Sequence, residues 1–257
     1  MIHFIIVSHG HDDYIYNLLN GLDNIYSQDF QFYIKDNIGS VDLKKYCNER
    51  NIDYLYSGKA KGFAANNNEM IDFISKKSVD WQRDYFIFLN PDIILTDDSI
   101  SKLVKVHNEN KYDLFCVDLF KDLEYLHRDP SVRHFPKPWD FFTSYLFNFN
   151  KSIINRDNIE VITRVDWFAG SFLAIKSDVF KTLQGFDEAY FMYCEDLDLC
   201  LRAHKNGFKA FYLPDIKVVH FTQHQNRKLF NQHMSWHLKS IFILYLKNFY
   251  YLIKHSR

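Results

Sequence analysis

Glycine, proline and cysteine are scarce in this sequence. Its 257 residues contain 8 Gly, 5 Pro and 4 Cys, far too few for a collagen-like or low-complexity chain. The cysteines form no C-x-x-C motif, so neither a zinc knuckle nor a disulfide framework is expected. We predict free thiols in a reducing cytoplasm at Cys47, Cys116, Cys194 and Cys200.

A charge imbalance and a long apolar run are also missing. The 31 Lys and Arg residues balance 32 Asp and Glu and give a net charge of -1, whereas nucleic-acid-binding proteins usually carry a strongly basic face. No nucleic acid partner is therefore expected. The best candidate for a membrane span, residues 241–253, falls short of ~18 apolar residues and contains Lys247. The first residues lack the pattern of a secretory signal.

The composition is otherwise that of a soluble globular protein. Hydrophobic residues make up 47% and charged residues 25%, while aromatic residues reach 18%. A chain of this length can bury a large core without disulfides or metals. It fits one domain or two closely fused lobes.

Strand and helix patterns alternate through the first half. Helical patterns separate short apolar runs, and this alternation predicts an α/β fold with a mostly parallel central sheet flanked by helices. Ligands bind beyond the carboxyl ends of the strands in such sheets. The predicted strands are residues 4–7, 30–34, 52–56, 85–89 and 114–117.

The alternation stops between about residues 120 and 164, where prolines and an aromatic cluster at 139–149 stand. An insertion of this length is either a lid or binding element, or a peripheral helix packed by its aromatics. Beyond it we predict that regular structure resumes at 166–175, followed by a helix at 195–206 and a pair of strands at 209–213 and 217–221.

The last segment, residues 216–257, has seven Lys and Arg residues and no Asp or Glu, which leaves -8 for the rest of the chain. Aromatic side chains are interleaved with these cations. A basic, aromatic helix suits the interface of an anionic bilayer. The alternative is a packed C-terminal helix with a solvated basic edge.

The first candidate for chemistry is Asn90-Pro91-Asp92, which follows the apolar run 85–89. A carboxylate at the tip of a buried strand can bind Mg²⁺ or Mn²⁺, which would neutralise a diphosphate leaving group. The alternative is an ordinary turn.

The second candidate is Glu195-Asp196-Leu197-Asp198, at the start of a predicted helix. Acidic residues there are favoured by the helix dipole alone. Asp198 and Arg202 are four residues apart and can pair along the helix, which leaves Glu195 or Asp196 at the tip. A carboxylate in that place can accept a proton from a sugar hydroxyl.

Three weaker signals lie at other strand and helix ends. His220 ends an apolar strand and either completes a metal shell or is simply hydrogen-bonded. Asp36 and Asn37 can read a nucleobase edge or form a turn. Residues 62–67 open a helix whose N–H groups could face a phosphate. They do not form the glycine fingerprint of dinucleotide-binding folds, and no P-loop motif occurs.

The order of these segments resembles that of family 2 glycosyltransferases of the GT-A fold. The opening residues 5–11 and the tail 236–240 are similar to those of bacterial O-antigen rhamnosyltransferases. The segments that carry the resemblance are Val7-Ser8-His9, Asp36-Asn37, Gly62-Phe63-Ala64, Asn90-Pro91-Asp92, Trp167-Phe168-Ala169-Gly170-Ser171, Gly185-Phe186-Asp187-Glu188, Phe191 to Arg202 and Val219-His220.

The resemblance implies an inverting transfer from a nucleotide sugar, dTDP-L-rhamnose, to a polyprenyl-diphosphate-linked sugar in O-antigen synthesis. It implies that Asp196 is the general base with Glu195 beside it, that Asp92 holds Mg²⁺ or Mn²⁺ with His220, and that Asp36 contacts the base. Further donor contacts are implied at Ser8, His9, Asn37, Gly62, Phe63, Asn67 and Asn90. The sugar and acceptor pocket is implied at Asp166, Trp167, Ala169 and Gly170.

The implied organisation is a catalytic domain at 1–225, with a nucleotide-sugar half at 1–119 and an acceptor half at 120–225. A membrane-associating basic amphipathic helix follows at 226–257. The enzyme is expected to be cytoplasmic and peripheral on the inner face of the bacterial cell membrane, whose anionic surface is a partner.

One departure from the fold's usual pattern is Asn90, where the wider fold has the first Asp of Asp-x-Asp; we therefore expect weaker metal binding. The alternatives are another donor (a UDP-hexose, a UDP-N-acetylhexosamine or a furanose), a non-catalytic membrane-bound assembly subunit, or a nucleotide-binding oxidoreductase. The missing glycine fingerprint disfavours the last of these.

Overall fold

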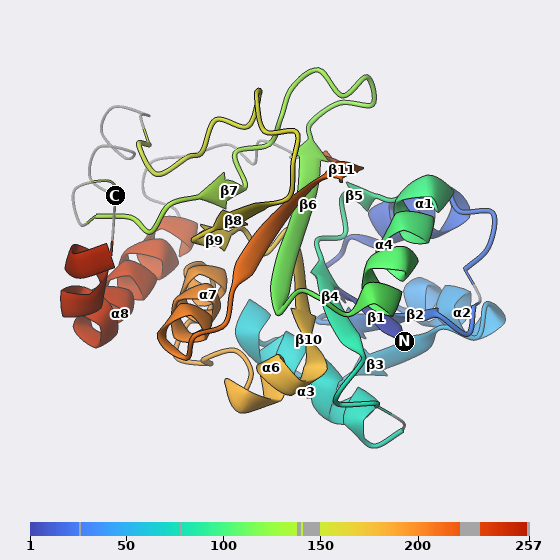
Figure 1. The fold of residues 1–257 in the computed structure, drawn as a ribbon. Helices are drawn as coiled ribbons and strands as arrows, with labels where there is room; N and C mark the ends of the chain where they lie inside the picture. Colours follow the sequence, from blue (N-terminus) through green and yellow to red (C-terminus); the bar gives the residue numbers. More distant parts are fainter. Residues whose placement is uncertain (26, 78, 138–139, 141–149, 222–231, 256–257) are drawn as a thin grey trace.

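A nine-stranded sheet forms the centre of the computed structural model, which describes residues 1–25, 27–77, 79–137, 140, 150–221 and 232–255 (Figure 1). The strand order is β3-β2-β1-β4-β10-β6-β11-β5, with β8 paired to β11. These strands are β1 (Ile2–Ser8), β2 (Phe30–Asp36), β3 (Asp53–Tyr56), β4 (Tyr85–Leu89), β5 (Ile93–Ile94), β6 (Leu114–Phe120), β8 (Thr163–Val165), β10 (Phe172–Lys176) and β11 (Ala210–His220).

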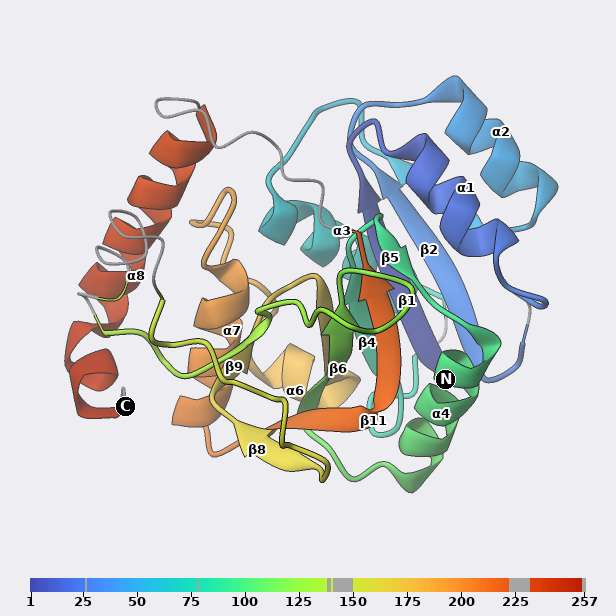
Figure 2. The same cartoon turned by 90° about the horizontal axis from the view of Figure 1, so that it is seen from above.

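Helices cover both faces of this sheet, as the alternation predicts. One apolar cluster joins one face to α1, α2 and α4, and a second cluster joins the other face to α3, α6 and α7 (Figures 1 and 2). Neighbouring residues of β1 illustrate this: Ile5 belongs to one cluster and Ile6 to the other, because side chains alternate along a strand. The helices are α1 (Asp12–Asn20), α2 (Val41–Glu49), α3 (Phe63–Ser75), α4 (Asp97–Glu109), α6 (Ser177–Thr182), α7 (Glu195–Lys205) and α8 (Gln232–His255).

The predicted parallel arrangement holds for β1, β2, β3 and β4, and β6 is parallel to β11. Between these two groups lies β10, which runs antiparallel to both β4 and β6. The sheet is therefore parallel from β3 to β4 in the strand order and mixed from β10 onward. A separate two-stranded ribbon pairs β7 (Val132–Arg133) with β9 (Trp167–Phe168).

The prediction of two strands at 209–213 and 217–221 is wrong. Residues 210–220 form one strand, β11, whose pairing with β6 shifts register between Leu213 and Lys217. Pro214 lies in this irregular stretch and has no N–H to donate to a ladder. The strand therefore bulges where the sequence suggests a turn.

The last described helix, α8, packs against the rest of the protein along one side. Ser240, Leu244, Asn248 and Leu252 are buried at every fourth position, and the two leucines join the core cluster. No helix among the described residues is long and apolar enough to cross a membrane. The aromatic cluster predicted at 139–149 and the predicted boundary at 225 fall on residues outside the described ranges.

Candidate active site

Polar residues that follow β1, β2 and β4 meet at one edge of the sheet. These strands are parallel, and Ser8 lies directly opposite Asp36 at their ends. Nδ1 of His9 hydrogen-bonds with Nδ2 of Asn37 at 3.2 Å. The structure therefore brings together the donor-side residues that the sequence places at these strand ends.

Asp36 and Asn37 are buried and shape the loops at this edge. The Asp36 carboxylate accepts hydrogen bonds from Ile38 N at 2.9 Å, Ser40 N at 2.6 Å and the Tyr54 hydroxyl at 2.7 Å. Burial by itself would raise the pKa of Asp36, but these hydrogen bonds outweigh it and lower the pKa. Asp36 is thus an ionised anchor for the turn, and its contact with a nucleobase stays a prediction.

Gly62 joins the start of α3 to the loop that precedes α7. The N–H of Phe63 donates to the Phe191 carbonyl oxygen at 3.0 Å. A Cβ atom on Gly62 would lie 2.2 Å from that same oxygen, so only glycine fits there. The Phe63 N–H is engaged by this bond, while the Asn67 side chain donates to the Phe63 carbonyl oxygen at 2.9 Å.

The NPD turn lies against the end of β11. Oδ1 of Asp92 is 3.3 Å from Nε2 of His220, and Nδ2 of Asn90 is also 3.3 Å from that nitrogen. The antiparallel pairing of β11 with β5 produces this contact, because His220 is opposite Ile93. The two residues predicted to share a metal are therefore neighbours.

The other ring nitrogen of His220 contacts Asp129, a residue that the sequence analysis did not select. Nδ1 of His220 is 3.3 Å from Oδ2 of Asp129, and both side chains are buried. Burial would lower the pKa of His220, but the hydrogen bonds and charges of Asp129 and Asp92 raise it to about 9. Metal-binding histidines commonly have such a carboxylate on their second nitrogen.

The donor set at this turn fits a divalent cation only in part. Among the described residues no group of three or more His, Cys, Asp or Glu side chains is arranged to hold a metal. Asp92 and His220 offer one oxygen and one nitrogen, and Mg²⁺ is usually held by one or two carboxylates together with substrate phosphates. The pair therefore suits an ion whose remaining ligands come from a diphosphate.

Asp196 stands at the tip of α7, partly exposed, with both oxygens hydrogen-bonded. Oδ2 accepts from Gly170 N at 2.8 Å and Oδ1 from Leu197 N at 2.7 Å. Glu195 beside it is buried, and its Oε2 has no hydrogen-bond partner among the described residues. Burial raises the pKa of both carboxyls, although the two N–H donors oppose the rise for Asp196.

The backbone before α7 is strained. Tyr193 and Cys194 have φ angles of 71° and 65°, a left-handed conformation that non-glycine residues seldom adopt. Such strain tends to occur at functional sites.

The expected pair along the helix is confirmed, since Nε of Arg202 donates to Oδ2 of Asp198 at 2.6 Å, which leaves Asp196 at the tip.

The NPD turn and the Asp196 carboxylate contact neighbouring residues of the chain. Asn90 N donates to the Ser171 carbonyl oxygen at 3.0 Å, and Gly170 N donates to Asp196. Because Gly170 and Ser171 are consecutive, the NPD turn and the tip of α7 flank one short stretch just before β10.

The residues predicted for the acceptor pocket belong to β9 and its surroundings. Nε1 of Trp167 donates to the His134 carbonyl oxygen at 2.8 Å, and Oδ2 of Asp166 is 3.0 Å from Nδ1 of His134. Ala169 N donates to the Ser131 carbonyl oxygen at 2.9 Å. These contacts tie the pocket residues to the segment after β6.

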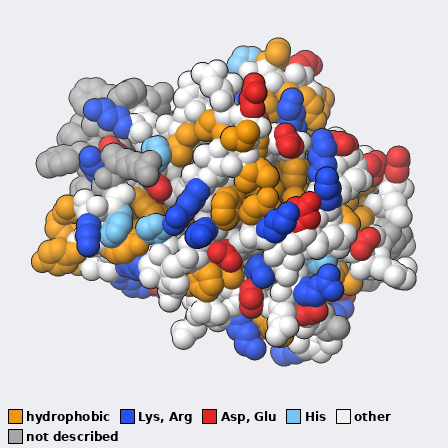
Figure 3. Space-filling view, viewed as in Figure 1, with side chains coloured by type: hydrophobic (Ala, Val, Ile, Leu, Met, Phe, Trp, Pro, Cys, Tyr) orange, Lys and Arg blue, Asp and Glu red, His pale blue; other side chains and the backbone are white. Residues whose placement is uncertain are grey.

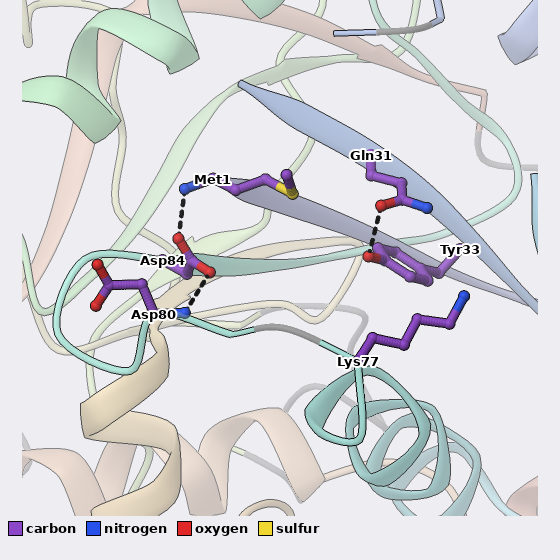
Figure 4. Close-up of a pocket in the computed structure, with 6 residues that line it drawn as sticks. All are labelled: Met1, Gln31, Tyr33, Lys77, Asp80 and Asp84. Atoms are coloured by element: carbon purple, nitrogen blue, oxygen red, sulfur yellow. Dashed lines mark hydrogen bonds and ion pairs between the residues drawn. The ribbon is translucent and has the colours of Figure 1, made fainter. Parts of the chain in front are cut away.

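A separate pocket of about 270 Å³ lies at the opposite edge of the sheet (Figure 4). Its residues precede or begin β1, β2 and β4, whereas the candidate site lies beyond the ends of those strands. Asp84 there binds the N-terminal ammonium and, at 3.1 Å, Nε2 of His3. The pocket is lined by Met1, Gln31, Tyr33, Lys77, Asp80 and Asp84.

Comparisons with known proteins show which family this chain is similar to. The model of glycosyltransferase-like family 2 matches residues 45–238. The rhamnosyltransferase WbbL of Escherichia coli (strain K12) is 40% identical over 243 residues, which are 94% of this chain and 91% of that protein. The N-acetylglucosaminyl-diphospho-decaprenol L-rhamnosyltransferase of Mycobacterium tuberculosis is 28% identical and matches 75% of this chain and 66% of its own length.

Similarity of fold extends to more distant proteins. The crystal structure of GalNAc-T7 with UDP, GalNAc and Mn²⁺ superposes with a TM-score of 0.66 at 13% identity. The superposition covers 96% of this chain and 47% of that one. At this level of identity the likeness concerns the fold alone.

Proposed function

The chain belongs to glycosyltransferase-like family 2 and has the GT-A glycosyltransferase fold, and from this premise we propose that it transfers L-rhamnose from dTDP-L-rhamnose to a polyprenyl-diphosphate-linked saccharide. The product would be part of an O-antigen or a related surface polysaccharide. The rhamnosyltransferases of Escherichia coli and Mycobacterium tuberculosis among its relatives support the sugar. The proposal is supported by the placement of Asp196 on Gly170 and of the NPD turn on Ser171, through the backbone N–H of Asn90.

The reaction is a single displacement with inversion at the anomeric carbon. Asp196 accepts the proton of the acceptor hydroxyl as that oxygen bonds to the anomeric carbon, while the bond to the donor diphosphate breaks and its electron pair leaves with dTDP. The raised pKa of Asp196 brings its basicity nearer to neutral pH, where a general base is most useful. The two N–H groups that hold the carboxylate fix its direction.

Asp92 and His220 would hold Mg²⁺ or Mn²⁺. When bound, the ion supplies positive charge to the departing diphosphate. Asn90 contributes an amide where the wider fold has a carboxylate, so the site has less negative charge than an Asp-x-Asp motif. We therefore propose a metal-assisted enzyme with modest metal affinity.

We also propose that the enzyme is cytoplasmic and binds the inner membrane surface through the outer face of α8. Five apolar side chains on this face are between 45% and 69% exposed. Figure 3 shows hydrophobic side chains gathered at the left edge of its view, where α8 lies. The exposed side chains of Lys239 and Lys254 on the same helix suit an anionic lipid surface. The five side chains are Leu238, Phe242, Leu246, Phe249 and Ile253.

An alternative occupant of this face, a second copy of the chain, is disfavoured by charge. Helix α8 carries three lysines and no acidic residue, so two copies packed helix to helix would repel each other. An anionic bilayer accepts both the apolar side chains and the lysines.

A donor screen tests the proposed reaction. The full-length protein is incubated with a synthetic lipid-diphosphate-linked GlcNAc acceptor and with dTDP-L-rhamnose, UDP-hexoses or UDP-N-acetylhexosamines, with and without Mg²⁺, and product mass is measured. A deoxyhexose increment from dTDP-L-rhamnose alone supports the proposal. A hexose or N-acetylhexosamine increment would assign another donor, and no product with any donor would contradict the transferase function.

A further inference from the structure

Arg133 is a cation of the acceptor half to which the sequence analysis gave no role. It lies directly opposite Trp167 in the β7–β9 ribbon, and its guanidinium carbon is 5.3 Å from the centre of the indole ring. Nε donates to the Pro130 carbonyl oxygen at 2.8 Å. The ring contact and this hydrogen bond hold the guanidinium group in one place.

The outer nitrogens of Arg133 are left for another group. Among the described residues, no hydrogen bond reaches Nη1 or Nη2 and no carboxylate lies within 4.0 Å of the guanidinium. Burial lowers the pKa of Arg133 more than the nearby charges of Asp196 and Asp129 raise it. The positive charge is thus only partly compensated by the protein.

The neighbours of Arg133 place it inside the candidate site. Asp129, which bonds to His220, and Asp196 are the two carboxylates whose charges act on it. Its own charge also lowers the pKa of His237 on α8, a pKa that burial has already lowered. Arg133 is therefore near enough to Asp129, to the proposed base and to α8 for their charges to interact.

We propose that Arg133 binds a substrate diphosphate through its two outer nitrogens. A guanidinium group offers a planar pair of N–H donors that matches two phosphate oxygens, and it keeps its charge at any physiological pH. No carboxylate of the described residues pairs with this guanidinium, so the partner that we infer is an anion brought by the substrates. This inference rests on the proposed function, in which both the donor and the lipid-linked acceptor carry a diphosphate.

If Arg133 binds a diphosphate, the site has a second positive centre in addition to the proposed metal ion. Because Asn90 stands where the wider fold has a carboxylate, we expect weaker metal binding at the NPD turn. The fixed guanidinium of Arg133 would then supply part of the positive charge that the diphosphate needs. The same chemistry could serve the dTDP diphosphate or the diphosphate of the acceptor lipid. Matched pairs of ligands distinguish the two.

The test measures binding without turnover, so it does not depend on which sugar is transferred. Calorimetry on full-length Arg133→Gln, Arg133→Lys and wild type compares dTDP with thymidine, and farnesyl diphosphate with farnesol in detergent, at constant Mg²⁺. Arg83→Gln, an exposed arginine near the other edge of the sheet, is the matched control. Arg133→Lys keeps the charge and guards against a folding defect in the glutamine variant.

We expect Arg133→Gln to weaken binding of at least one diphosphate about tenfold or more, as for loss of a hydrogen-bonded charge pair, with Arg133→Lys between it and wild type. Thymidine, farnesol and Arg83→Gln should show changes below about twofold. The diphosphate that loses affinity identifies the substrate held by Arg133. Affinities for both diphosphates within twofold of wild type in the folded variants would overturn the inference, even if rhamnose transfer is confirmed.

Discussion

The backbone N–H of Gly170 donates a 2.8 Å hydrogen bond to Oδ2 of Asp196, and the next residue, Ser171, accepts one from Asn90. A Cβ atom at position 170 would meet Asp196 Cβ at 3.5 Å, so the two chain segments are in close contact. The proposed base and the turn proposed to bind the leaving group are thus positioned by the same two residues. Because Asp92 and Asp196 belong to different segments, each carboxylate can be replaced by itself to test its proposed role.

Asp196→Asn should abolish transfer and keep donor binding. The amide fills the same space but cannot accept the proton, and a general base typically contributes ~10²–10⁴ in rate. We expect kcat to fall at least a hundredfold while the Kd for dTDP stays within about twofold. Steady-state assays and calorimetry measure the two quantities. Glu195→Gln is the matched neighbour, and a larger loss of kcat in that variant would make Glu195 the base.

Asn90→Asp should tighten metal binding, and Asp92→Ala should weaken it. Both side chains lie 3.3 Å from Nε2 of His220, so a second carboxylate at position 90 would add an oxygen ligand to the same place. We expect shifts of about tenfold in opposite directions, measured as the Mn²⁺ affinity by electron paramagnetic resonance with dTDP present. Asp98→Asn, an exposed carboxylate on α4, is the control. Identical titration curves for all four proteins would remove Asp92 from the metal site.

The outer face of α8 should govern vesicle binding. Phe242 and Leu246 are 65% and 69% exposed, and replacing both by Glu removes apolar area and adds negative charge. We expect binding to anionic vesicles to fall at least tenfold in a flotation assay. Val41→Glu with Leu126→Glu changes the net charge equally at exposed apolar positions outside α8 and should bind like wild type. Equal flotation of the two double variants would contradict the proposed surface.

Asp84 should make stability dependent on pH in the acid range. Burial would raise its pKa, but hydrogen bonds from His3, the N-terminal ammonium and Asp80 N lower it to about 2. A depressed carboxyl pKa stabilises the folded state above 3.8, and this gain disappears as pH falls through about 2. Asp84→Asn should cost about 2 kcal/mol at pH 7, and the gap to wild type should close in acid.

Urea unfolding of wild type and Asp84→Asn at several pH values measures this gap. Asp23→Asn, an exposed carboxylate, controls for the loss of a charge. A gap that stays constant down to pH 2 would show that the effect of Asp84 is not electrostatic.

Gly62→Ala should disturb both stability and turnover. The added Cβ would lie 2.2 Å from the Phe191 carbonyl oxygen, so the loop leading to Asp196 must move. Overpacking of this kind costs about 1–3 kcal/mol. We expect a lower midpoint of thermal unfolding and a lower kcat. Gly170→Ala, whose added atom would make only ordinary contacts, should keep its stability.

The sequence predicts the layers of this fold well because its strands are short apolar runs between amphipathic helices. The Asp198–Arg202 pair was predictable as well, since its spacing follows from helix geometry alone. The continuous β11 was not predictable, because Pro214 and Asp215 have the composition of a turn. Only pairing with β6 on both sides of the bulge keeps the strand intact.

Asp129 and Arg133 escaped the sequence analysis for a related reason. Both lie in a stretch without regular periodicity. The N–H of Asp129 donates to the Leu119 carbonyl oxygen on β6, and Arg133 is placed by the pairing of β7 with β9, more than thirty positions further along the chain. The sequence itself shows only that a charged Asp and a charged Arg stand within a few residues of Pro130, and it does not show that they are buried. Long-range pairing, rather than local pattern, determines where these charges lie.

The contact of α8 with the loop before α7 decides how shortened forms of the protein must be interpreted. The Ser240 hydroxyl donates to the Met192 carbonyl oxygen at 2.8 Å, four positions ahead of Asp196, and Lys247 pairs with Asp187 in the same loop. A truncation after residue 225 would remove this brace and uncover the core that Leu244 and Leu252 seal. An inactive truncated enzyme would therefore say little about lipid attachment, and anchoring has to be dissected by single side chains on an intact helix.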